Sequence, residues 1–115
     1  MKTDILIIGA GPAGIFTALE LVKAGRTDHI VMVEKGLPVD KRSCPTKVCV
    51  NCKPSCNITT GFSGAGAFSD GKLSLSYEVG GALPELIGPD TAQTMIDYTD
   101  KIYLEFGADS HVEGL

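Results

Sequence analysis

The feature that most constrains this chain is a glycine-rich turn between an apolar run and a helical pattern. Residues 5–8 read ILII, as is typical of a parallel strand covered on both faces. After the turn, apolar residues recur at helical spacing, and Gly25 stands where a helix would end. HIVMVEK, residues 29–35, predicts a second buried strand. The order strand–helix–strand predicts an α/β fold built on a parallel sheet.

The turn reads GAGPAG, which is the pattern G-x-G-x-x-G over residues 9–14. It follows a predicted strand and opens a predicted helix, which is the context that dinucleotide binding requires. Gly9 allows a tight turn, Gly11 lets a pyrophosphate approach, and Gly14 lets helix and strand pack closely. Free N–H groups at the start of the helix then face the phosphates. Pro12 and Ala13 complete the candidate phosphate-binding turn.

Glu34 ends the second predicted strand, twenty residues after Gly14. A carboxylate at this point can accept hydrogen bonds from ribose hydroxyls and would repel a 2′-phosphate. The pattern therefore favours FAD or NAD over NADP. Lys35 follows Glu34 directly and is included in the candidate cofactor site.

A second glycine-rich segment, GFSGAGAFSDGK, covers residues 61–72. With GAGPAG, VEKG and Arg42 before it, nearly all of the chain resembles the N-terminal part of poorly characterised FAD-dependent dehydrogenases. These belong to the broad group of flavoproteins with two dinucleotide-binding domains. Phe62-Ser63 stands where a glycine is common, so the start of this segment departs from the pattern.

This resemblance implies an FAD-dependent oxidoreductase with a Rossmann-like FAD-binding βαβ unit. It places the pyrophosphate on the three glycines of the first motif and the adenosine ribose on Glu34. It implies that Arg42 lies near the adenosine end of the cofactor. It also implies contacts to the pyrophosphate or flavin from the second segment, at Gly64, Ala65, Gly66 and Ser69. No catalytic residue is indicated, because the flavin carries the redox chemistry.

The unit is expected to be incomplete. Similar flavoproteins close the FAD site with a late Gly-Asp, and this sequence contains no such dipeptide. A third core strand is also missing from the predicted elements. We therefore expect an amino-terminal portion of an oxidoreductase. The alternative is a non-catalytic FAD-binding half of a split enzyme, which would need a second chain to complete the flavin site.

Four cysteines fall within thirteen residues of an aperiodic loop, predicted over residues 36–60. Their spacing, C-x4-C-x2-C-x3-C, matches two iron–sulfur patterns in part. Four thiolates can also hold zinc, although zinc sites usually pair two C-x2-C units. Four reduced thiols, or a reversible disulfide, in an exposed loop are the alternative interpretations. The sequence thus predicts a candidate metal centre, with iron–sulfur ahead of zinc and electron transfer as a further function, at Cys44, Cys49, Cys52 and Cys56.

The chain is expected to divide into an FAD-binding segment, residues 1–80, and the start of a second region, residues 81–115. LSLSYEV, residues 73–79, alternates as a half-buried strand does. A helix is expected at about residues 90–106, with Asp90 and Gln93 as a capping box. Its buried stripe is predicted at Ala92, Met95, Ile96, Thr99, Ile102, Tyr103 and Phe106.

Charge and hydropathy limit the partners. The net charge of −4 and the absence of a basic run give little support to nucleic-acid binding. The uncharged run after Asp4 lasts fifteen residues, whereas a membrane-spanning helix needs about 20. Asp4 stands where a secretory segment would be basic, and no clear cleavage site follows. We expect a cytoplasmic protein, in which thiols stay reduced.

Overall fold

A computed structural model describes residues 2–114. Those up to Gly71 form one compact unit and those from Lys72 onward form a second. The division drawn from the sequence, after residue 80, lies nine residues later.

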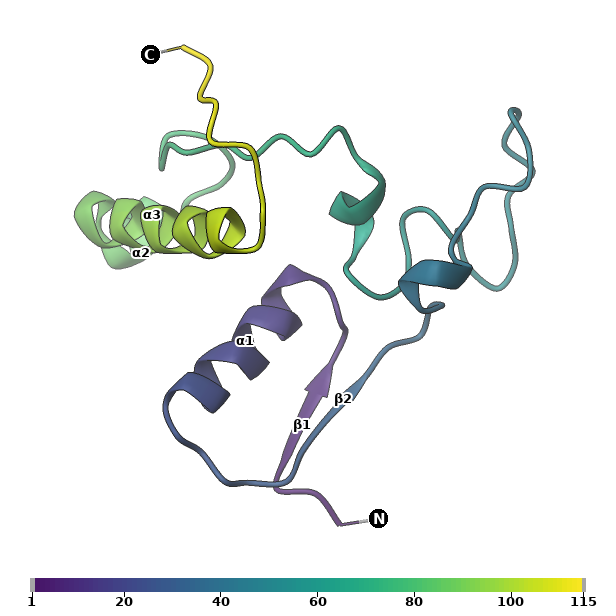
Figure 1. Cartoon of the computed structure of the whole chain (residues 1–115), viewed down its shortest axis with the longest axis horizontal. Helices are drawn as coiled ribbons and strands as arrows, with labels where there is room; N and C mark the ends of the chain where they lie inside the picture. The colour runs from purple at the N-terminus through teal and green to yellow at the C-terminus, as the bar shows by residue number, and fades with distance from the viewer. Residues whose placement is uncertain (1, 115) are drawn as a thin grey trace. The chain divides into compact units, whose positions relative to one another are not determined.

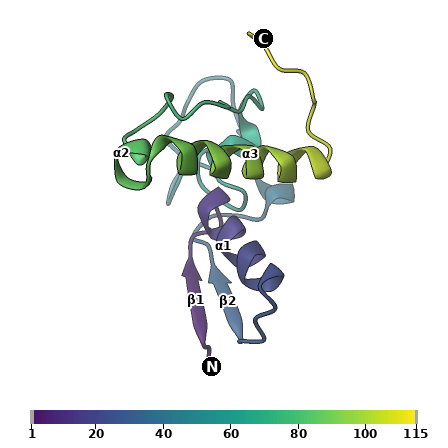
Figure 2. The ribbon, with the colours of Figure 1, turned by 90° about the vertical axis from the view of Figure 1, so that its left-hand side faces the viewer.

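The first unit contains the predicted strand–helix–strand arrangement. Strand β1 covers Ile5–Ile8, helix α1 covers Pro12–Lys23, and strand β2 covers Ile30–Val33. The two strands pair in parallel, with Ile5 opposite Ile30 and Ile8 opposite Val33. In Figures 1 and 2 the two arrows point the same way and α1 runs beside them. The α/β fold with an incomplete, two-stranded parallel sheet is therefore confirmed.

Helix α1 ends where the sequence predicts. Gly25 adopts a left-handed φ of +71°. Its N–H donates to the carbonyl of Val22 (3.0 Å), and the N–H of Arg26 donates to the carbonyl of Leu21 (3.1 Å). These two bonds form a Schellman motif, which satisfies carbonyls that the end of a helix leaves open. Glycine suits this position because it lacks the Cβ that opposes a positive φ.

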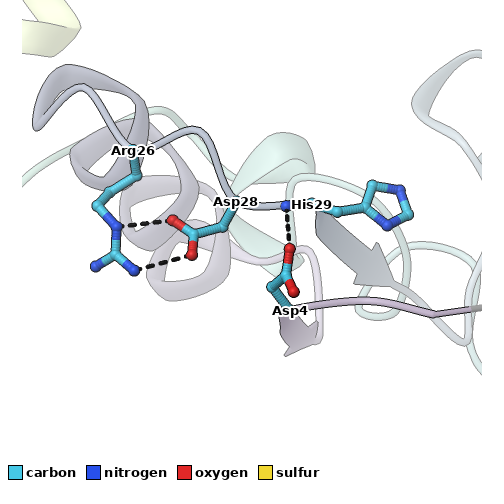
Figure 3. Close-up of polar contacts among 4 residues, drawn as sticks. All are labelled: Asp4, Arg26, Asp28 and His29. Carbon is cyan, nitrogen blue, oxygen red and sulfur yellow. Dashed lines mark hydrogen bonds and ion pairs between the residues drawn. The ribbon is translucent and has the colours of Figure 1, made fainter.

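Polar contacts hold the connection from α1 to β2 near the N-terminal ends of the two strands (Figure 3). The carboxylate of Asp4, just before β1, accepts a hydrogen bond from the backbone N–H of His29 (2.8 Å). Arg26 and Asp28 form an ion pair at 2.7 Å. Hydrogen bonding to Arg26 lowers the pKa of Asp28. The pair is solvent-exposed, so its effect on stability is small.

The second unit consists of two helices and an extended segment. Helix α2 covers Leu83–Ile87 and packs against helix α3, which covers Pro89–Glu105. Helix α2 was not predicted from the sequence. Figure 2 shows α3 as a long straight helix preceded by the short α2. Gly107, with φ +98°, follows the last turn of α3, so the helix ends close to the predicted end at about residue 106.

The capping box predicted for α3 is wrong. The helix begins after Gly88, and no side chain caps its N-terminus. Pro89 starts it instead, since a proline fits the first helical position, where no N–H partner is needed. The side chain of Gln93 is used elsewhere. It donates to the carbonyl of Leu75 (3.0 Å) and accepts from the N–H of Tyr77 (3.3 Å).

Those two bonds also explain why the predicted strand at residues 73–79 is wrong. The segment carries no strand among the described residues. A strand needs partners for its backbone N–H and C=O groups. Here one amide side chain from α3 supplies a donor and an acceptor to the extended chain, without a strand neighbour.

The hydrophobic core of each unit is small. Among the described residues, the buried apolar side chains are Ile7 and Ala10 in the first unit and Ala92 and Ile102 in the second. Several other apolar side chains face outward, including Ile8 (82% exposed) and, within the predicted α3 stripe, Met95 and Phe106. Among the described residues, no helix is long and apolar enough to cross a membrane.

Candidate functional site

The first glycine turn links the end of β1 to the start of α1. Gly9 has φ +99°, and its N–H donates to the carbonyl of Val33 at the end of β2 (2.8 Å). Gly11 is the extended N-cap residue of α1, and Pro12 occupies its first turn. A Cβ on Gly11 would meet only the Cα of Gly64, at 3.9 Å. The turn therefore keeps open space beside Gly11, as a closely approaching phosphate requires.

Gly14 packs α1 onto the turn. A Cβ at this position would lie 2.0 Å from the carbonyl oxygen of Gly9 and 3.2 Å from a methyl carbon of Ile7. The backbone of the helix therefore approaches the strand more closely than any side chain permits. This geometry is the one that the motif assigns to its third glycine.

The head of α1 offers unpaired backbone donors. The first backbone hydrogen bond of the helix runs from Ile15 N–H to Gly11 C=O (3.0 Å). No side chain caps this end, and no acidic residue lies in its first turn. The N–H groups of Ala13 and Gly14 precede that first bond. Together with the helix dipole they favour an anion at this end.

Glu34, which directly follows β2, is hydrogen-bonded to the first glycine turn. Its carboxylate accepts a hydrogen bond from the N–H of Ala10 (2.9 Å) and another from the N–H of Gly36 (2.8 Å). These two bonds lower the pKa of Glu34, so the group is ionised at neutral pH. A carboxylate oxygen can accept more than one hydrogen bond, so the predicted ribose contact is compatible with this geometry. The neighbouring Lys35 is exposed.

The first part of the second glycine segment, residues 61–66, lies against the first turn. The N–H of Ser63 donates to the carbonyl of Ala10 (2.8 Å), and Gly64 faces Gly11 and Pro12. Ser63 and Gly64 have φ of +75° and +72°. In the sequence, Phe62-Ser63 stands out only as a departure from the glycine pattern, so the role of Ser63 in joining the two segments was not predicted.

The other predicted residues of this segment form a short 3-10 helix, Ala65–Phe68. Ala65 and Gly66 lie in its exposed part. The hydroxyl of Ser69 donates to the carbonyl of Gly66 (2.8 Å) and accepts from the N–H of Gly71 (3.2 Å). Ser69 thus closes the end of the segment, and its predicted flavin contact stays a prediction.

Arg42 is buried, with 4% of its surface exposed. Its guanidinium donates to backbone carbonyls of the loop that follows the cysteines and of the second glycine segment. The sequence predicted a cofactor contact for this residue, and that contact stays a prediction. The structure shows in addition a structural role that the sequence did not reveal.

The four cysteines line one pocket of about 210 Å³, with Pro45, Thr46 and Lys53 among its other residues. All four are free thiols. Within the described part of the chain, no group of three or more His, Cys, Asp or Glu side chains is placed so that it could hold a metal ion. This geometry does not fit an iron–sulfur cluster or a structural zinc ion. The iron–sulfur prediction therefore gains no support.

The thiol of Cys56 differs from an ordinary solvent-exposed thiol. A hydrogen bond from the side chain of Thr59, then the backbone N–H groups of Thr59 and Ile58, lower its pKa, and the charge of Arg42 acts in the same direction. The side chain of Cys56 is exposed. Hydrogen bonds of this kind favour a thiolate, which is the reactive form of cysteine.

Comparison with known proteins supports a flavin site in the first unit. A family model described as an FAD binding domain matches residues 2–47, which contain β1, α1, β2 and Arg42. An uncharacterized protein of Clostridium beijerinckii (strain ATCC 51743 / NCIMB 8052) is 39% identical over 79 residues. The match spans 64% of this chain and 14% of that relative. No solved structure matches the chain.

Proposed function

We propose that this chain supplies the dinucleotide-holding part of an FAD-dependent oxidoreductase of the dehydrogenase type. The observation that carries the proposal is that Glu34, after β2, and Ser63, in the second glycine segment, both bind Ala10 in the first glycine turn. The N–H of Ala10 is held by Glu34 and its carbonyl by Ser63. The match of residues 2–47 to an FAD binding domain supports FAD as the dinucleotide.

The residues present fit the adenosine diphosphate half of FAD. The N–H groups of Ala13 and Gly14 would bind the pyrophosphate, and the space beside Gly11 would admit it. Glu34 would accept hydrogen bonds from the ribose hydroxyls. When bound, FAD would supply two-electron redox chemistry. The net charge of −4 does not oppose this assignment, because backbone dipoles hold phosphates without charged side chains.

A second candidate is an FAD-binding half that acts with a partner chain. Exposed apolar surface on β1 favours it, since Ile8 is 82% and Leu6 53% exposed in a sheet of two strands. Parallel sheets are normally covered on both faces. In this case added FAD would bind weakly to the chain alone and tightly once the partner is supplied.

The direct test is an FAD titration of the purified protein, followed by flavin fluorescence and absorption. The wild-type chain is expected to bind FAD, and NADP is expected to bind much more weakly. Gly11→Val would place a branched side chain in the space beside the turn, and valine readily adopts the extended backbone conformation of Gly11. We expect it to abolish FAD binding.

Ala24→Val is the control, because it adds similar bulk at the opposite end of α1. It should bind FAD as the wild type does. Wild-type protein that takes up no FAD, with or without a partner chain, would overturn the proposal. A cytoplasmic location is part of the proposal.

A further inference from the structure

Arg42 holds two separate stretches of backbone at once. Its Nε donates to the carbonyl of Asn57 (2.8 Å), and one terminal nitrogen donates to the carbonyl of Ile58. The other terminal nitrogen donates to the carbonyls of Phe62 (2.6 Å) and Gly64 (2.9 Å). The first pair of acceptors follows the cysteine loop, and the second pair belongs to the second glycine segment.

The surroundings of the side chain leave it little freedom. Arg42 is 4% exposed, and the ring of Phe68 lies 4.6 Å from its guanidinium carbon. A Cβ on Gly61 would lie 2.6 Å from Arg42 Cδ, so position 61 requires glycine next to the arginine side chain. A buried cation must have its N–H groups hydrogen-bonded. The four carbonyls accept from four of the five guanidinium N–H groups, and lysine, with one nitrogen, cannot reach them all.

These bonds orient the peptide unit between Phe62 and Ser63. The C=O and N–H of a trans peptide point in opposite directions. Because the Phe62 carbonyl points to Arg42, the Ser63 N–H points away from it, and it donates to the carbonyl of Ala10 (2.8 Å). Arg42 and Ala10 therefore hold one peptide unit from its two sides. Ala10 is itself held by Glu34 through its N–H (2.9 Å).

We infer that Arg42 is a positioning residue, which fixes residues 61–66 against the first glycine turn without touching FAD. The effect on cofactor affinity rests on the proposed function, whereas the effect on the segment does not. Loss of the arginine would leave four carbonyls without this donor and would free the Phe62–Ser63 peptide to rotate. The second glycine segment would then separate from Ala10.

The experiment compares amide hydrogen exchange in wild-type, Arg42→Lys, Arg42→Met and Lys41→Met proteins without FAD. Lys41→Met is the matched control, because it removes one positive charge from the neighbouring, exposed residue. In both Arg42 variants, exchange of the hydrogen-bonded N–H groups of Phe62, Ser63 and Gly64 should rise at least tenfold. Protection of the Gly9 N–H, bonded to Val33, should be kept. The control should match the wild type throughout.

Titration of the same four proteins with FAD gives the second readout. Both Arg42 variants should bind FAD at least tenfold more weakly, and Lys41→Met should bind it normally. A direct charge contact would let Arg42→Lys retain much of the affinity, whereas a positioning role would not. If the wild type binds no FAD, with or without a partner chain, but the exchange result holds, the proposed function fails and the positioning role stands.

Two exchange results would overturn the inference. Unchanged exchange over residues 61–66 in both Arg42 variants would show that the segment does not depend on the arginine. An equal loss of protection across β1, α1 and β2, in Arg42→Lys as well as Arg42→Met, would show that the residue supports the whole unit. Wild-type FAD affinity in Arg42→Lys would also contradict it.

Discussion

Replacing Gly14 with alanine should destabilise the first unit, although alanine is the better helix former. The new Cβ would lie 2.0 Å from the carbonyl oxygen of Gly9, where real contacts are at least 3.0 Å. One of the two groups must therefore move by about 1 Å. The Gly9 carbonyl shares its peptide unit with the Ala10 N–H, so the same movement would disturb the bond to Glu34.

The magnitude follows from two opposing effects. Overpacking costs about 1–3 kcal/mol, and the upper end applies because backbone meets backbone. The gain in helix propensity is about 1 kcal/mol. The free energy of unfolding should therefore fall by about 2 kcal/mol, which lowers the melting temperature of a unit of this size by about 10 °C.

Thermal unfolding of the FAD-free protein, followed by circular dichroism, provides the assay. Gly66→Ala is the control, because a Cβ on Gly66 would meet nothing within 4 Å. It should melt as the wild type does. A Gly14→Ala protein that is as stable as the wild type would refute the close helix–strand packing at this turn.

Three further predictions concern the neighbouring contacts. Glu34 has a lowered pKa in the folded protein, so its stabilising effect is present above its ordinary value of 4.5 and is lost as the pH falls through the lower folded value. Melting temperatures of wild type and Glu34→Gln should therefore differ at neutral pH and converge in acid. Thr59→Val should raise the pH at which Cys56 is alkylated by iodoacetamide, measured by mass spectrometry; an unchanged pH profile would contradict the hydrogen bond from the hydroxyl. Gly61→Ala should cost about 1–3 kcal/mol in urea unfolding, because its Cβ would meet Arg42 and it has φ +139°. Wild-type stability would exclude that contact.

The sequence was sufficient for the part of the fold that local patterns specify. Apolar runs and glycine positions gave β1, α1 and β2, together with the ends of α1 and α3. The strand at residues 73–79 failed because alternation shows which face is apolar but not whether a partner strand exists. Helix α2 was missed because its five residues are too few to show a helical period.

The site was predictable only where a motif sets the geometry. The roles of Gly9, Gly11 and Gly14 follow from their spacing. The burial of Arg42 does not, because its partners are backbone carbonyls, which every residue carries. The four cysteines line one pocket, but close spacing in the sequence does not by itself place them so that they could hold a metal ion.

The central claim is that backbone N–H groups at the head of α1 hold a diphosphate. Nuclear magnetic resonance of the ¹⁵N-labelled chain, titrated with ADP and separately with riboflavin, tests it most directly. ADP should shift the amide signals of Gly11, Ala13 and Gly14, and riboflavin, which has no phosphate, should leave them in place. If these three amide signals do not move with ADP, the N–H groups at the head of α1 do not hold a diphosphate.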